Sequence, residues 1–159
     1  MQPIIIPFTP NRLGRIVFES KVMTGDRKSL GTVMFKLDTG SDFTTISCDE
    51  LKLLGYTQEY LKSCPHHVGG ATLAADEHKT TLQYIPNVSI KFDDRELQHC
   101  RIYFALGTKL RSLFGGDILK YFNIEINNNE KEIRLSKRED DIPMLDDEMQ
   151  IQIYSIEQG

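Results

Sequence analysis

Short runs of β-branched and aromatic residues recur along this chain between turn residues, and this pattern constrains the fold more than any other feature. Helical periodicity appears only in brief pieces, so the sequence predicts a mostly β fold with one or two short helices. The chain has 159 residues, which suits one hydrophobic core and is too short for two. We therefore expect one domain over residues 1–138 and an acidic tail over residues 139–159.

One predicted strand leads directly into an aspartate. Residues 15–23 and 32–37 are typical of a hairpin that turns around residues 24–26. The second strand alternates between two faces, one formed by Val33, Phe35 and Leu37 and the other by Met34 and Lys36. A buried strand that ends in Asp38 places this carboxylate at the edge of a sheet, where hydrogen bonds must offset its desolvation.

Other elements follow from caps and turn residues. Ser47 and Glu50 have the spacing of a helix capping box, and Gly55 is a natural stop for that helix. Residues 82–92 and 97–106 are predicted strands, the first of which begins or is interrupted at Pro86.

Near the end of the domain, Asp117 is expected to open a short helix that runs through Phe122. Strands at residues 124–126 and 133–135 should then flank an asparagine turn at residues 127–129.

The tetrad Asp38, Thr39, Gly40 and Ser41 follows the predicted strand. By itself this sequence is ordinary turn chemistry, because Asp bonds nearby backbone amides and Gly accepts positive φ. In its context, however, residues 35–41 resemble the active-site loop of aspartic peptidases. Residues 113–119 are similar to the apolar, apolar, glycine signature that closes the lobe of a retropepsin, in the bacterial form with Gly, any residue, Asp, an apolar residue and Leu.

Between these motifs, Val68, Gly69, Gly70 and Ala71 resemble the glycine-rich flap of the same family. The resemblance covers residues 15–135. It implies a single-lobe retropepsin-like acid protease barrel with a flap hairpin.

The resemblance also implies roles for individual residues. Asp38, Thr39 and Gly40 would be catalytic: Asp38 supports the lytic water, Thr39 bonds across a two-fold axis, and the backbone of Gly40 donates to the carboxylate. Ser41 would support the carboxylate. The substrate would be contacted by Ser41, Val68, Gly69, Gly70 and Ala71. Gly115 would pack beneath the active-site loop, and Asp117 would cap the following helix.

A single carboxylate cannot both accept and donate the protons that peptide hydrolysis requires. This chain has one Asp-Thr-Gly motif, so the resemblance implies an aspartic endopeptidase that works as a homodimer, with Asp38 from each copy. Two such carboxylates should share one proton, and we expect activity at acidic to near-neutral pH. The substrate would be an extended peptide or protein held through its own backbone.

Two other functions fit the same motif. The chain could be a non-catalytic module of this fold that grips an extended peptide without cutting it. Phosphoryl transfer by Asp38 is disfavoured, because that chemistry normally brings a second nearby acid and a magnesium site.

Composition argues against several partners. A net charge of -4 with no basic stripe argues against nucleic acid, and no stretch approaches the roughly 20 apolar residues that span a bilayer. The start of the chain has no basic lead and no small-residue cleavage site, so we expect the cytoplasm. Cys48, Cys64 and Cys100 match no disulfide or zinc spacing, so we expect reduced thiols, no metal and no cofactor.

The tail carries an acidic run and then, at residues 151–156, the alternation of an edge strand. Because retropepsins typically build a sheet across the dimer from their chain ends, residues 4–6 and 151–156 are candidates for that sheet. The tail could instead occupy the cleft or dock a partner.

Overall fold

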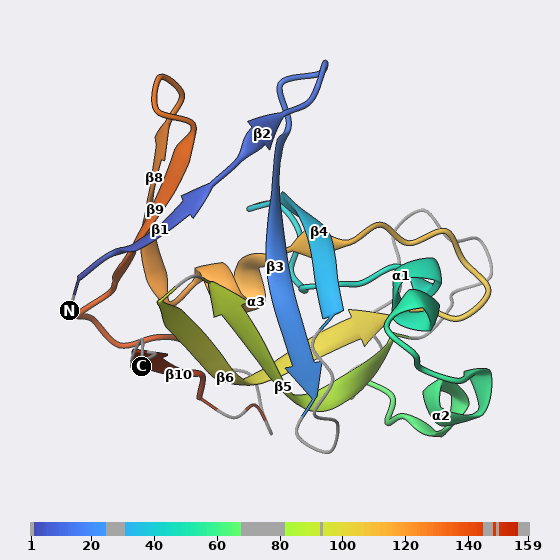
Figure 1. The fold of residues 1–159 in the computed structure, drawn as a ribbon. Coiled ribbons are helices and arrows are strands. Elements are labelled where there is room, and N and C mark those ends of the chain that lie inside the picture. Colours follow the sequence, from blue (N-terminus) through green and yellow to red (C-terminus); the bar gives the residue numbers. More distant parts are fainter. Residues whose placement is uncertain are drawn as a thin grey trace.

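Two sheets form the fold in the computed structural model, which describes residues 2–24, 31–67, 82–92, 94–144, 148 and 150–155. Within these residues, a seven-stranded sheet has the order β10-β6-β5-β3-β4-β7 with β2 paired to β3, and a three-stranded sheet has the order β1-β9-β8 (Figure 1). The strands are β1 (Ile4–Pro7), β2 (Thr9–Pro10), β3 (Ile16–Thr24), β4 (Gly31–Leu37), β5 (Gln83–Phe92), β6 (Arg95–Phe104), β7 (Leu113–Phe114), β8 (Phe122–Asn127), β9 (Glu132–Lys137) and β10 (Gln152–Ser155). The helices are α1 (Cys48–Leu53), α2 (Gln58–Ser63) and α3 (Gly116–Leu119).

The predicted mostly β class is confirmed, and so are its main strand pairs. β3 and β4 form the expected antiparallel pair, with Phe18 opposite Phe35; most of the turn between them lies outside the described residues. β5 and β6 also pair antiparallel. β5 continues through Pro86, and its irregularity takes the form of a register shift between Ile85 and Val88, where Asn87 has a φ of 55°.

The helices are short, and they depart from the prediction in number and length. α1 begins after Ser47, whose hydroxyl accepts a hydrogen bond from the amide of Glu50 at 3.2 Å, and Gly55 follows its end with a φ of 93°. α2 was not predicted; Thr57 caps it by accepting from the amide of Tyr60. α3 ends at Leu119 rather than Phe122, because Phe122 already pairs with Lys137 in the β8–β9 ladder.

Four aromatic rings fill the core beneath the strands that carry the site. Phe114 of β7 meets Phe18 and Phe35 edge to face, with centroids 5.3 and 5.7 Å away, and Phe92 lies 6.0 Å from the same ring. Each ring is buried, and such packing contributes both apolar burial and favourable ring geometry. The loop that follows β4 is thus attached to a rigid base.

Both ends of the described chain pair with strands of the same chain. β1 pairs with β9 and β10 pairs with β6, so the predicted edge strand in the tail is confirmed. Arg95 connects the two ends, because its guanidinium donates to the carbonyl of Gln2 at 2.9 Å and its backbone lies opposite Ser155. A sheet built from these ends across a dimer stays a prediction.

Across the described residues, no helix has the length and apolar character needed to cross a membrane.

Candidate active site

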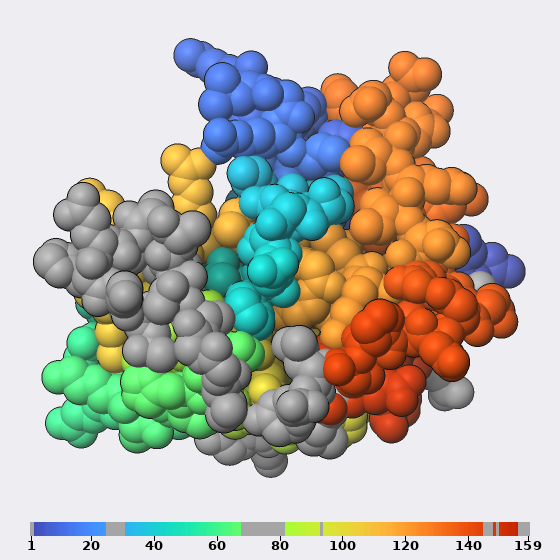
Figure 2. Space-filling model, turned by 180° about the vertical axis from the view of Figure 1, so that it is seen from behind, coloured from blue at the N-terminus to red at the C-terminus, as the bar shows by residue number. Residues whose placement is uncertain are grey.

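Asp38 lies where β4 leaves the sheet. Its amide donates to the carbonyl of Phe114 at 3.0 Å, which extends the parallel pairing of β4 with β7 by one residue. Its side chain is about 29% exposed. In the view of Figure 2, the cyan segment that contains this loop lies at the surface near the middle of the face. The carboxylate is therefore held in place by its backbone and is accessible to solvent.

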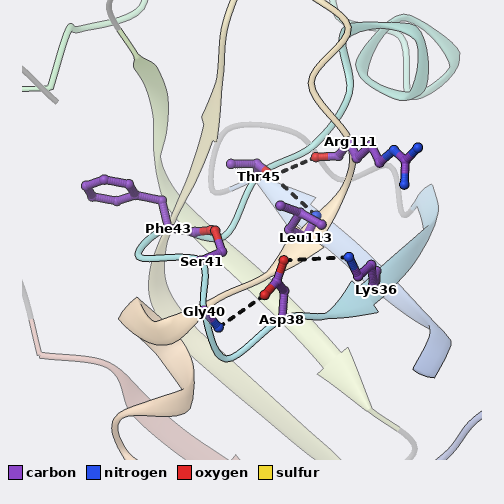
Figure 3. Close-up of polar contacts among 8 residues, drawn as sticks. All are labelled: Lys36, Asp38, Gly40, Ser41, Phe43, Thr45, Arg111 and Leu113. Carbon is purple, nitrogen blue, oxygen red and sulfur yellow. Dashed lines mark hydrogen bonds and ion pairs between the residues drawn. The ribbon is translucent and has the colours of Figure 1, made fainter. Parts of the chain in front are cut away.

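The loop folds back on the carboxylate (Figure 3). The amide of Gly40 donates to Asp38 Oδ1 at 3.1 Å, and the amide of Ser41 donates to the carbonyl of Asp38 at 3.2 Å. The first of these is the bond expected of Gly40. Ser41 directs its hydroxyl to the carbonyl of Phe43 at 2.9 Å and so braces the loop backbone. Thr39 is exposed, and its bond to a partner loop stays a prediction.

Lys36 lies beside the carboxylate. Its Nζ is 3.8 Å from Asp38 Oδ2, and both side chains are partly exposed (Figure 3). Asp38 comes two positions after Lys36, directly beyond the end of β4, and alternation along an extended chain brings side chains at this spacing to the same side. The alternation of the strand could have identified this neighbour, although the sequence motif assigns Lys36 no role.

Two glycines form the platform under the loop. A Cβ atom on Gly115 would lie 2.4 Å from the carbonyl oxygen of Phe43, so only glycine fits there. The amide of Gly116 donates to the carbonyl of Ser41 at 2.7 Å. The close packing that the resemblance implied for Gly115 is confirmed.

Asp117 connects the loop to this platform. Its Oδ1 accepts hydrogen bonds from the hydroxyl of Thr44 at 2.7 Å and from the amide of Ile118 at 3.0 Å. Thr44 in turn accepts from the amide of Gly115. The N-cap of α3 is Gly115 and Asp117 lies inside the helix, so the prediction that Asp117 caps this helix is wrong. The carboxylate of Asp117 instead accepts the hydrogen bond from Thr44. Burial raises the pKa of Asp117 to about 6, against the opposing effect of these hydrogen bonds.

A second connection under the site was not visible in the sequence. Ser112 donates its hydroxyl to Glu50 of α1 and accepts from the amide of Ser47. In a capping box, Glu50 would reach that amide itself; here Ser112 stands between them. The helix start is thereby tied to the segment that enters β7.

The four flap residues, Val68, Gly69, Gly70 and Ala71, lie outside the described residues. The chain just before them is in place: the amide of His67 donates to the carbonyl of Leu82 at 2.8 Å, and its ring contacts Phe43 and Tyr103 with centroids 4.9 and 5.7 Å away. These aromatic contacts place His67, which directly precedes the flap residues in the sequence, next to Phe43 at the end of the Asp38 loop.

A groove of about 640 Å³ lies between the N-terminal segment and the strands β3, β4 and β5, with Phe8, Phe18 and Met34 among its lining residues. Asp38 does not line this groove.

A curled, mostly β sheet with one Asp-Thr-Gly loop over a pair of parallel strands is the architecture of retropepsin-like aspartic proteases. The search of solved structures found such a protein: the chain is similar to the crystal structure of a retropepsin-like aspartic protease from Rickettsia conorii. The TM-score is 0.53 with 19% sequence identity, over 84% of this chain and 89% of that one. No family model and no curated protein matches the chain. At this identity the likeness shows the fold, which is the retropepsin-like fold predicted from the sequence.

Proposed function

We propose that this protein is an aspartic endopeptidase whose active site forms between two copies of the chain. Each copy contributes one Asp38, and an extended peptide binds across the pair. The observation that carries this proposal is the Asp38 loop itself: an accessible carboxylate, bonded by the amide of Gly40 and fixed on the platform of Gly115 and Gly116.

The need for a second copy follows from the chemistry. Within the described part of the chain, the contacts of the Asp38 carboxylate are with the amide of Gly40 and the ammonium group of Lys36, and neither is a second carboxylate that could share a proton with it. Peptide hydrolysis by water requires one group that accepts a proton and one that donates it. A two-fold axis next to the exposed Thr39 supplies the second carboxylate from the partner.

In this mechanism the two carboxylates share one proton. The ionised one removes a proton from a water molecule held between them, and the protonated one donates to the peptide carbonyl as the tetrahedral intermediate forms. The roles then reverse, so that the leaving amine receives a proton and the peptide bond breaks. No covalent bond forms between the enzyme and the substrate. The protein also works without a bound cofactor.

Cleavage of a peptide library tests this proposal. Wild-type protein should cut a subset of peptides, Asp38→Asn should cut none, and both should sediment as dimers. Asp42→Asn is the matched control, because it makes the same chemical change at an exposed residue of the same loop. A wild-type protein that sediments as a monomer at all accessible concentrations, or an Asp38→Asn variant that still cleaves, contradicts the proposal.

One observation favours a second function, a module that binds peptides without cutting them. The ammonium group of Lys36 lies 3.8 Å from Asp38 Oδ2, where it would compete with a water molecule for the carboxylate. A module of this kind would bind library peptides and leave them intact in both the wild type and Asp38→Asn, so the same assay separates the two functions.

A further inference from the structure

Lys36 lies beside the carboxylate of the proposed active site. Its side chain is about 27% exposed, and its Nζ lies 3.8 Å from the carboxylate of Asp38, which follows β4 directly. A peptide whose scissile bond reaches Asp38 therefore passes within contact distance of the ammonium group.

The backbone of Lys36 cannot move away from this position. It lies opposite Val17 of β3 on one side and Leu113 of β7 on the other, and its amide donates to the carbonyl of Ser112 at 3.1 Å. A side chain on a strand paired on both sides is presented more precisely than one on a loop. The ammonium group has three donors, so a contact with Asp38 leaves donors for a ligand.

The charge balance of the paired site changes because of Lys36. Two Asp38 carboxylates that share one proton carry a net charge of about -1. With two Lys36 ammonium groups added, the site carries about +1. A site of this sign attracts an acidic side chain and repels a basic one.

We infer that Lys36 makes the site selective for peptides with Asp or Glu next to the scissile bond. This inference rests on the proposed function, because the site it describes is formed by two copies. The alternative is that Lys36 is a solvated neighbour of Asp38 and has no influence on the choice of substrate.

The first test uses matched peptides that differ only in the residues flanking the scissile bond, with Glu, Gln or Lys at each position in turn. Wild-type protein should show the highest kcat/KM for Glu and the lowest for Lys. Lys36→Met should reduce the ratio of Glu to Gln by up to about fivefold, the upper range for an exposed ion pair, and Lys36→Arg should retain it. Lys21→Met removes the same charge from an exposed position of β3, and it should leave the ratio unchanged.

Salt provides a check that does not depend on a substitution. The preference of the wild type for Glu should weaken between 0.05 and 0.5 M NaCl, since screening shortens the reach of exposed charges to below about 10 Å. Lys36→Met should show no such dependence.

An unchanged ratio of Glu to Gln in Lys36→Met would overturn the inference. If the rates for all peptides also rise equally, Lys36 restrains the carboxylate and does not choose the substrate.

A binding measurement separates this inference from the proposed function. Fluorescence anisotropy with labelled peptides is carried out on Asp38→Asn and on Asp38→Asn with Lys36→Met. If the wild type cleaves nothing but acidic peptides bind more tightly only when Lys36 is present, the peptidase is refuted and the selectivity stands. If cleavage occurs and neither measurement depends on Lys36, the peptidase stands and the selectivity is refuted.

Discussion

Asp117 is partly buried, and its carboxylate holds the hydroxyl of Thr44. Burial raises the pKa of this group from 3.8 to about 6, so the native chain binds more protons than the unfolded chain between these values. The resulting stabilisation is fully present below pH 3.8 and is lost as the pH rises through about 6. A pKa difference of this size corresponds to at most about 3 kcal/mol.

The variant Asp117→Asn tests this effect. Asparagine keeps an oxygen that accepts from Thr44 but has no charge to desolvate. The free energy of unfolding of Asp117→Asn minus that of the wild type should therefore increase by about 1–3 kcal/mol between pH 4.5 and pH 7.5, because the wild type loses stability over this range. Urea unfolding at both pH values measures this difference, and an equal difference at both would contradict the argument.

Gly115 makes a steric prediction at the same scale. In Gly115→Ala the added methyl group would lie 2.4 Å from the carbonyl oxygen of Phe43, and backbone atoms cannot move aside cheaply. We expect a loss of about 3 kcal/mol or more in the free energy of unfolding, together with a loss of peptidase activity.

Gly116→Ala is the matched control, because its methyl group would lie 3.3 Å from the carbonyl oxygen of Ser41 and at the start of a helix. We expect it to change stability by less than about 1 kcal/mol. Denaturant unfolding of both variants measures the contrast. Similar losses in the free energy of unfolding would contradict the argument that the close contact at Gly115 is what makes its substitution costly.

At the scale of elements, the residue directly before β10 is buried and fixes the end of the described chain. Ile151 is about 8% exposed and its amide donates to the hydroxyl of Tyr121. Ile151→Ala should lower the free energy of unfolding by about 2–4 kcal/mol. Tyr154→Ala, at an exposed position of β10, should cost less than about 1 kcal/mol. Thermal and urea unfolding check both, and a harmless Ile151→Ala would mean that the tail detaches in solution.

The strands were predictable because their signal is local. Alternating burial in β4 and the turn residues between β8 and β9 can be recognised in the sequence alone. The helices were harder. α2 has six residues and buries only Leu61, so it leaves little periodicity, and the apolar spacing of Ile118 and Phe122 is typical of a helix although Phe122 lies in a strand.

The site divides in the same way. Asp38, Thr39 and Gly40 were predicted from a contiguous motif, and the bond from Gly40 was found as expected. The connection from Ser112 to Glu50 joins residues 62 positions apart, and the bond from Thr44 to Asp117 joins residues 73 apart. Such contacts depend on how the strands assemble, and no local pattern in one sequence indicates them.

At the scale of the whole molecule, the proposed active site requires two intact copies. Mixing the wild type with three equivalents of Asp38→Asn, well above the concentration for dimer formation, should lower the rate per wild-type chain to about one quarter, because random pairing gives most wild-type chains an inactive partner. Peptide cleavage after subunit exchange measures this.

Asp42→Asn is again the matched control, since three equivalents of this variant should leave the rate per chain unchanged. A rate that is equally insensitive to Asp38→Asn would mean that each chain acts alone.

The parallel pair of β4 and β7 has a consequence for synthesis. Lys36 and Leu37 lie opposite Leu113 and Phe114. The loop that carries the Asp38 carboxylate therefore cannot pack in its native position until the ribosome has released the chain beyond residue 117. Protein synthesis proceeds from the N-terminus, and a nascent polypeptide that already displays Asp-Thr-Gly outside the exit tunnel still lacks the surface that holds it. Under the proposed function, an unfinished chain therefore cannot cut peptides, because it cannot assemble the reactive loop.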